Sequence, residues 1–352
     1  MTRLDPKIGS YRSPWWLPEG HSQTLWRRFA PPAPVRQRRQ RVELSDGDFV
    51  DVDWVDVAET DAKPEQPIVL LLHGLCGSAL SPYIQSLQRL LQQRGITSAA
   101  MNFRGCSGEI NRRARAYHSG CTEDVEEVFQ CLRAEHPQRN FVFAGYSLGG
   151  NVLLKWLAEI GRREGVLGGV AVSTPFSLSY CSQALNSGMS KLYGHYFRRR
   201  LIEDVERKRT FFREQARHTG WQDDLARLEA LGDLRRLKTL WEFDDQVTAP
   251  LHGFCDAEDY YGRCSSGPLL QDIQSQVALI QSANDPIIPV ASLPNMATLP
   301  PHISLNLEAA GGHVGFTCAG DPNWLEERVF TALSKMNEPT HASYIEVRRR
   351  FD

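Results

Sequence analysis

A serine flanked by glycines, Ser147, stands at the junction of two segments of different character. The apolar run 141–144 precedes it, as in a strand, and the helix-forming segment 151–157 follows it. This order of strand, sharp turn and helix is typical of a nucleophile elbow, the G-x-S-x-G turn that lifts a serine hydroxyl above a sheet. Glycines are needed at 145 and 149 because such a strained turn leaves no room for side chains beside it. The pattern predicts that Ser147 is a nucleophile.

A serine nucleophile needs a general base, and the base needs an acid that orients it. In the fold that the elbow indicates, the chain order is serine, acid, histidine. Asp285 follows the apolar run 277–281, and His313 lies in a glycine-rich loop after the last strand-like segment. Both residues come directly after predicted strands, so their side chains can converge on Ser147. We therefore predict a triad of Ser147, Asp285 and His313.

Four other aspartates compete with Asp285 for the role of the acid. Some related folds take the acid from an earlier strand end, and all four precede the penultimate predicted strand; they are Asp244, Asp245, Asp256 and Asp259. Asp285 is the stronger candidate because it comes just beyond the end of a strand.

Acyl transfer also needs donors aimed at the oxyanion that develops, typically two backbone N–H groups. One is expected from Leu148, the residue after the nucleophile. The other is expected from Leu75, in the loop 73–78 after the first long buried strand, where small neighbours let the main chain approach a ligand. His73 begins the same loop, and we interpret it as a hydrogen-bonding residue that stabilises the loop rather than as a base.

The patterns typical of cofactor and metal sites are absent from the sequence. The glycines at 145–150 lack the Lys-Ser/Thr ending of a P-loop, and no G-x-G-x-x-G opens a helix after the first buried strand. The histidines and aspartates show no tight ligand spacing, and the eight cysteines form no C-x-x-C pair. We expect no cofactor, no metal and reduced cysteines.

Strand-like and helix-like segments alternate along most of the chain. Continuous apolar runs, typical of strands covered on both faces, lie at 67–72, 97–102, 141–144, 168–173, 277–281 and 303–307. Amphipathic helical patterns lie at about 82–94, 122–135, 149–162 and 322–335. Two short period-2 segments within 41–55, with a turn at Asp46-Gly47, predict an antiparallel hairpin. The alternation predicts an α/β fold in which helices flank a mostly parallel, twisted sheet.

One long interval, 175–266, contains no convincing strand but several helical patterns. We interpret it as a helical cap inserted between late strands, above the carboxyl ends of the strands, where open α/β sheets place their sites. The predicted organisation is an N-terminal arm at 1–40 that packs on the core, a core at 41–174 and 267–336, the cap at 175–266, and a C-terminal tail at 337–352.

The composition excludes several functional classes. A formal net charge of −2 over 352 residues leaves no basic excess to neutralise nucleic-acid phosphates. No apolar run approaches the ~20 residues that span a bilayer, and the N-terminus lacks the apolar segment of a signal peptide. We expect a cytoplasmic protein that binds no nucleic acid and has no integral membrane segment; the sequence leaves its oligomeric state open.

Several motifs together resemble the YheT-like branch of the α/β-hydrolase superfamily, the AB hydrolase 4 family, from about residue 14 to 336. They are 20–24 (Gly-His-Ser-Gln-Thr), 73–75, 102–108, 145–151, 248–254 with 259–261, and 311–316. The resemblance implies an α/β-hydrolase fold and a triad that maps onto Ser147, Asp285 and His313. Family members commonly have Asp-Asp-Pro where this chain has Asn284-Asp285-Pro286, which leaves Asp285 as the acid.

The resemblance also implies a reaction class and a substrate. Members look like carboxylesterases and lipases, so we expect a serine carboxylic ester hydrolase that acts through an acyl-enzyme. Its partner would be a small-molecule ester or lipid, namely short- to medium-chain acyl esters or acylglycerols. Two alternatives stay open: an acyltransferase or ester synthase with the same triad, and a non-catalytic lipid-binding protein on a hydrolase scaffold.

The N-terminal arm carries two features without an assigned chemistry. For the motif 20–24 we expect packing of the arm against the core rather than catalysis. Trp15 and Trp16, followed by Arg36, Arg38, Arg39 and Arg41, could seat the arm on an anionic lipid surface as a peripheral membrane contact. A solvated basic stretch beside buried aromatic side chains is the favoured interpretation.

Overall fold

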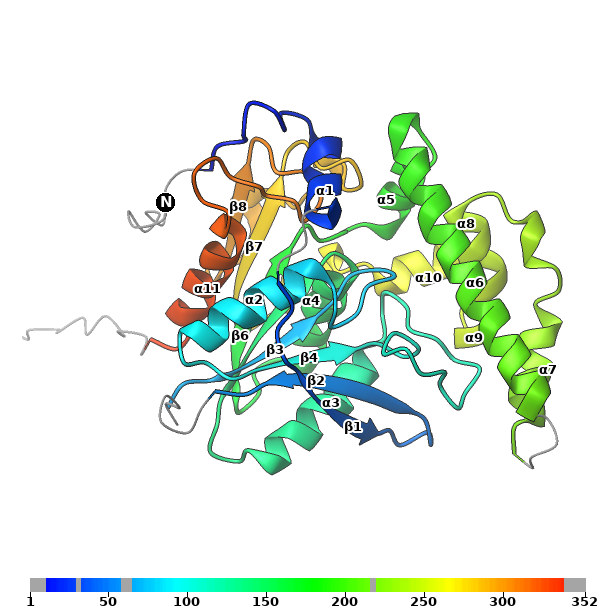
Figure 1. Ribbon diagram of the computed structural model, residues 1–352. Helices are drawn as coiled ribbons and strands as arrows, with labels where there is room; N and C mark the ends of the chain where they lie inside the picture. Colours follow the sequence, from blue (N-terminus) through cyan, green and yellow to red (C-terminus); the bar gives the residue numbers. More distant parts are fainter. Residues whose placement is uncertain (1–10, 30–32, 58–64, 216–219, 339–352) are drawn as a thin grey trace, which may run out of the picture.

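The computed structural model describes residues 11–29, 33–57, 65–215 and 220–338 (Figure 1). Within these ranges, eight strands form one sheet in the order β1-β2-β4-β3-β5-β6-β7-β8. The pairs β1–β2 and β2–β4 are antiparallel, and all other pairs are parallel. The strands are β1 (Arg38–Glu43), β2 (Phe49–Val55), β3 (Ile68–Leu72), β4 (Ser98–Asn102), β5 (Phe141–Tyr146), β6 (Val166–Val172), β7 (Gln276–Ser282) and β8 (Ile303–Glu308). The prediction of a mostly parallel sheet is confirmed.

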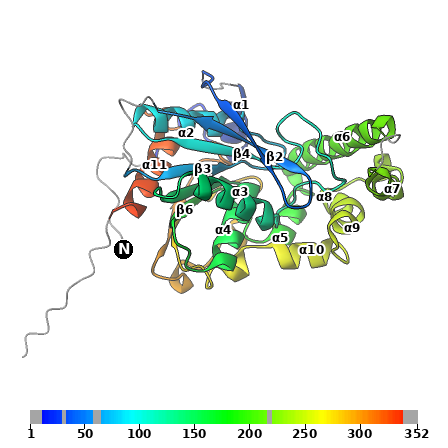
Figure 2. The ribbon, with the colours of Figure 1, turned by 90° about the horizontal axis from the view of Figure 1, so that it is seen from below.

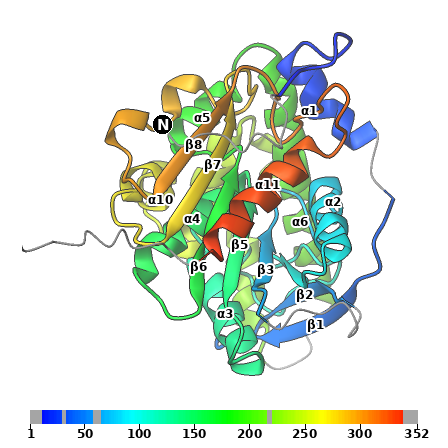
Figure 3. The same cartoon turned by 90° about the vertical axis from the view of Figure 1, so that its left-hand side faces the viewer.

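Helices cover both faces of this sheet (Figure 2, Figure 3). Alternate residues of β3 show why its apolar run is continuous: Leu70 packs in the cluster with α3 and α4, whereas Val69 packs in the cluster with α2 and α11. Both clusters are buried, so neither face of the strand tolerates polar residues. The helices are α2 (Pro82–Gln93), α3 (Thr122–Glu135), α4 (Leu148–Ile160) and α11 (Trp324–Met336).

Helices also fill the interval between β6 and β7, and they lie to one side of the sheet (Figure 1). They pack on one another through their own apolar cluster, which includes Val205, Phe212 and Leu228. The α-helices of the interval are α5 (Leu178–Ala184), α6 (Lys191–Gln215), α7 (Gln222–Ala230), α8 (Leu240–Phe243), α9 (Ala249–His252) and α10 (Ala257–Cys264). The treatment of 175–266 as a separate cap stays a prediction, and we use the word cap for these helices.

The N-terminal arm contains regular secondary structure. The motif 20–24 begins a helix, α1 (Gly20–Phe29), and β1 starts at Arg38, before the predicted end of the arm at 40. Gly20, Ser22 and Thr24 are poor helix formers, so the first turn of α1 has a low helix propensity. The first ten residues of the arm and most of the predicted tail lie outside the described residues.

The two tryptophans of the arm are exposed, whereas three of its arginines are paired within the sheet. Trp15 is 90% exposed and Trp16 is 45% exposed, so the interpretation of these aromatic side chains as buried was wrong. Arg38, Arg39 and Arg41 lie on β1 and form ion pairs with aspartates of β2 and the residue after it. The helix α1 and the strand β1 lie at opposite ends of the molecule (Figure 1, Figure 3). Across the described ranges, no helix is long and apolar enough to cross a membrane.

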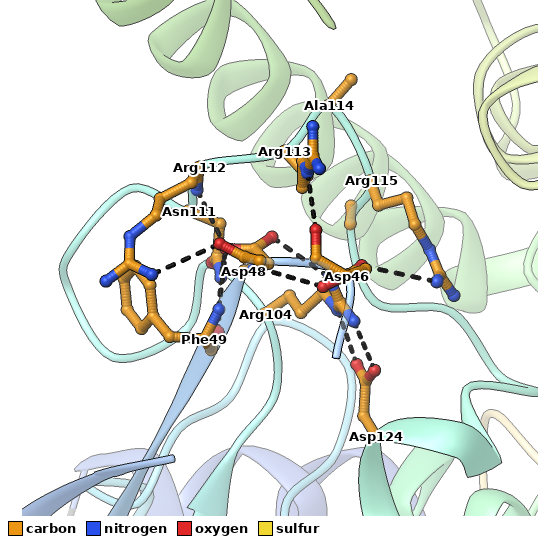
Figure 4. Close-up of polar contacts among 12 residues, drawn as sticks. Asp46, Asp48, Phe49, Arg104, Asn111, Arg112, Arg113, Ala114, Arg115 and Asp124 are labelled. Carbon is orange, nitrogen blue, oxygen red and sulfur yellow. Dashed lines mark hydrogen bonds and ion pairs between the residues drawn. The ribbon is translucent and has the colours of Figure 1, made fainter. Parts of the chain in front are cut away.

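Arg104, two residues after the end of β4, lies at the centre of a buried ion cluster (Figure 4). The Arg104 guanidinium pairs with both carboxylate oxygens of Asp124 in the first turn of α3, at 2.8 and 2.7 Å. It also contacts Asp46 at 2.7 Å and Asp48 at 3.1 Å, both from the turn between β1 and β2. Only 1% of the arginine side chain is exposed, so this planar donor fork ties three segments together in the interior.

The loop that follows Arg104 connects the core to the cap. Lys208 of α6 donates its Nζ protons to the carbonyl oxygens of Arg113, at 2.9 Å, and Arg115, at 2.6 Å. Asp224 of α7 accepts a hydrogen bond from the Ala114 N–H at 2.7 Å. The ion cluster therefore fixes the start of this loop, and residues 113–115 farther along the loop contact the cap helices α6 and α7.

We expect the substitution Arg104→Met to lower the free energy of unfolding by about 3–5 kcal/mol, because it removes the ion-pair partner of the buried Asp124 carboxylate. The matched control is Arg38→Met, which removes an exposed arginine from its pair with Asp56 and should have a small effect, since exposed pairs contribute at most about 1 kcal/mol. Equilibrium urea denaturation measures both. Similar shifts of the two unfolding midpoints would contradict the assignment.

Candidate active site

Ser147 occupies a strained turn between β5 and α4. Its backbone angles are φ 53° and ψ −122°, a conformation that costs a non-glycine residue about 1–3 kcal/mol. Its N–H donates to the Val172 carbonyl of β6 at 2.8 Å, which pins the turn to the neighbouring strand. A Cβ at Gly149 would lie 2.5 Å from the carbonyl oxygens of both Leu72 and His73, so only glycine lets α4 approach β3 this closely.

The structure brings the three predicted triad residues together in one hydrogen-bonded row. His313 Nε2 lies 2.9 Å from Ser147 Oγ, and His313 Nδ1 lies 2.9 Å from Asp285 Oδ2. A carboxylate only accepts hydrogen bonds, so Nδ1 carries the proton and Nε2 is free to accept the serine proton. The other carboxylate oxygen of Asp285 accepts the N–H groups of Ile287, at 2.8 Å, and Ile288, at 3.0 Å, which fix its orientation.

The competing aspartates make other contacts, and none of them is hydrogen-bonded to His313. Asp244 accepts the hydroxyl protons of Tyr261 and Thr248, each at 2.7 Å, and burial raises its pKa to about 6. Asp256 caps the start of α10, Asp259 pairs with Arg263, and Asp245 accepts the Ala257 N–H.

The two predicted oxyanion donors, Leu75 and Leu148, line the same cavity as Ser147. The neighbouring N–H groups in the loop after β3 are already used: Gly74 donates to the Tyr83 hydroxyl at 2.9 Å, and Cys76 donates to the Tyr117 hydroxyl at 2.8 Å. For the N–H groups of Leu75 and Leu148, the structure records no acceptor among the described residues. These two amides are therefore available to a ligand oxygen beside the serine.

His73 holds the same loop in place. Its buried ring accepts the Phe103 N–H at Nε2, at 3.1 Å, and therefore donates from Nδ1 to the Gly74 carbonyl, at 2.8 Å. Burial lowers its pKa to about 4, so the ring stays neutral at physiological pH. Its contacts are those of a loop-stabilising residue and not of a base for Ser147.

The cavity beside Ser147 has a volume of about 160 Å³ and extends between the core and the cap. Its walls are mainly apolar, and many of their residues were not identified from the sequence. They include Ile288 and, on α6, Phe197, Leu201 and Val205. The three α6 residues recur every four positions, so helical periodicity was the signal that could have identified them. In the described part of the chain, no group of three or more His, Cys, Asp or Glu side chains could hold a metal ion.

Known proteins resemble this chain over most of its length. A model of the α/β hydrolase fold family matches residues 67–317. The chain is 40% identical over 295 residues to the putative esterase YheT of Escherichia coli K12, with 82% of each chain covered. It is 29% identical over 308 residues to human phospholipase ABHD3, covering 86% of this chain and 72% of that one.

Solved structures extend the comparison at the level of the fold. The Pyrococcus furiosus esterase Pf2001 superposes with a TM-score of 0.53 at 16% identity, covering 88% of this chain and 97% of that one. At this identity the likeness concerns the fold alone. The family match over 67–317 agrees with the mostly parallel sheet and with the bacterial and human relatives. The protein therefore belongs to the α/β-hydrolase fold family, in the YheT-like branch.

Proposed function

We propose that the protein is a serine carboxylic ester hydrolase that acts through an acyl-enzyme on short- to medium-chain acyl esters or acylglycerols. The observation that carries the proposal is the unbroken row of hydrogen bonds from Ser147 through His313 to Asp285, beside two unused backbone N–H groups. The relatives named as esterase and phospholipase support the reaction class. A yeast relative, 25% identical over 265 residues, is named monoacylglycerol lipase and supports acylglycerols among the substrates.

The arrangement can carry out both halves of ester hydrolysis. His313 Nε2 takes the proton of Ser147 Oγ as the oxygen attacks the ester carbonyl, and the Leu75 and Leu148 N–H groups stabilise the oxyanion. The imidazolium then gives its proton to the departing alcohol, which leaves an acyl-enzyme. Water, deprotonated by the same nitrogen, attacks that ester and releases the acid. Asp285 keeps the proton on Nδ1 throughout and stabilises the imidazolium.

We infer that the acyl group of the substrate occupies the cavity under the cap. Its apolar walls favour a hydrocarbon chain, which gains about 0.8 kcal/mol for each methylene that it buries. A volume of about 160 Å³ is close to that of an engineered cavity of about 150 Å³ that holds benzene. This size favours short to medium acyl chains over long ones.

The substitution Ser147→Ala should abolish hydrolysis of p-nitrophenyl esters from acetate to dodecanoate and labelling by a fluorophosphonate probe. In a comparable triad, loss of the serine lowers kcat by on the order of 10⁶. The control Ser187→Ala removes an exposed serine and should keep wild-type rates. Full hydrolysis of every ester by Ser147→Ala would refute the proposal.

A second experiment separates acyl transfer from hydrolysis. With ethanol or glycerol added, it measures the ratio of transesterified product to free acid.

We expect Leu201→Trp to shorten the preferred acyl chain, because the larger ring fills the part of the cavity lined by α6. The ratio of kcat/KM for octanoate to that for acetate should fall roughly tenfold or more, since one methylene in an apolar pocket changes the rate by about 10–200-fold. Leu192→Trp is the matched control, because Leu192 lies on the same helix, is exposed and does not line the cavity. An unchanged chain-length profile in Leu201→Trp would place the acyl chain elsewhere.

A further inference from the structure

The loop that carries His313 has little regular structure of its own. Val314 has a φ of 56° and Phe316 a φ of 42°, in the left-handed region where side chains are strained. Only one N–H in this stretch, that of Phe316, donates within the loop, to the Gly311 carbonyl at 2.7 Å. The other backbone donors of the loop therefore need acceptors from outside it.

Four N–H groups of this loop donate to side chains from outside it. Those of Gly312 and Val314 are held by core residues, Asn284 Oδ1 at 3.0 Å and Ser173 Oγ at 3.0 Å. The other two are held by the N-terminal arm: His313 donates to Thr24 Oγ1 at 2.8 Å, and Thr317 donates to Gln23 Oε1 at 2.8 Å. The motif 20–24 thus supplies half of these acceptors, including the one for the histidine itself.

The Thr24 hydroxyl is oriented for this contact. It donates its own proton to the Gly20 carbonyl one turn earlier in α1, at 2.7 Å, so a lone pair remains for the His313 N–H. The start of α1 also lies directly against the loop that carries the acid, because a Cβ at Gly20 would be 1.9 Å from the Asn284 carbonyl oxygen. One helix end therefore contacts both the loop of the acid and the loop of the base.

Gln23 makes the second tie between the arm and the histidine loop. Its side chain is fully buried, and its Nε2 donates to the Leu17 carbonyl at 2.9 Å while its Oε1 accepts the Thr317 N–H. His21, the histidine of the motif, does not line the cavity beside Ser147. It stacks on Tyr193 of α6, with 5.7 Å between the ring centroids.

We propose that Thr24 is a positioning residue that sets the place of His313 relative to Ser147 and Asp285, so that the arm is part of the catalytic apparatus. This inference rests on the proposed function. Without the hydroxyl, the His313 N–H loses its acceptor and the strained loop relaxes, which moves the imidazole away from the serine. A misplacement of about 1 Å can cost a hundredfold in rate. The acyl chain should bind as before, because neither Thr24 nor His313 lines the cavity.

The test compares Thr24→Val, which keeps the shape but lacks the hydroxyl, with Thr24→Ser, which keeps the hydroxyl. Active sites are first counted by fluorophosphonate titration, so that unfolded protein does not affect kcat. For p-nitrophenyl butyrate we expect Thr24→Val to lower kcat per titrated site about 10- to 100-fold with KM little changed. Thr24→Ser should restore most of the rate. Ser22→Ala is the matched control, because among the described residues the Ser22 hydroxyl is hydrogen-bonded to the Glu19 carbonyl alone.

A second readout needs no substrate. The low-field proton resonance of the His313 Nδ1–H, hydrogen-bonded to Asp285, should be preserved in Thr24→Ser and shifted or lost in Thr24→Val. Wild-type kcat, KM and resonance in Thr24→Val would overturn the inference. It would also be overturned if Thr24→Val lost only thermal stability and titratable sites, with kcat per site unchanged. Failure of the proposed function is distinct, because it appears as wild-type protein that neither hydrolyses esters nor reacts with the probe.

Discussion

The backbone of Ser147 is the constraint on which the candidate site depends. A serine at φ 53° and ψ −122° persists only where its surroundings hold it, and here the hydrogen bond to Val172 and the contact of Gly149 with β3 do so. Because β3, β5, β7 and β8 are parallel, the loops with Leu75, Asp285 and His313 follow strand ends at the same edge of the sheet as the elbow. The parallel arrangement of the strands therefore brings these loops close to the strained turn at Ser147.

The cavity depends on a second interaction, the buried ion cluster of Arg104. This arginine lines the cavity and also anchors the loop that the cap helices contact through Lys208 and Asp224. Burial lowers the pKa of Lys208 to about 8, and its two carbonyl acceptors compensate for part of the lost hydration. Charged side chains of the core and the cap therefore hold in place the helices that line the cavity.

Sequence patterns were most informative where the physical signal is local. The apolar runs located every strand of the parallel sheet, and the glycine-flanked serine located the turn between β5 and α4. The arm shows the opposite case. Its helix α1 starts with residues of low helix propensity, and it forms because Gln23 and Thr24 find partners in the histidine loop. Trp15, interpreted as buried from its type, is exposed because no element among the described residues covers it.

By itself, the sequence determined the alternation of strands and helices, the elbow at Ser147 and the order of serine, acid and histidine, because periodicity and turn chemistry depend on neighbouring residues. Only the tertiary structure decided that His313 reaches both Ser147 and Asp285, which amides stay free, and which side of α6 lines the cavity. The contact between Thr24 and His313 joins residues 289 positions apart. Such contacts follow from the packing of whole elements, which no local pattern records.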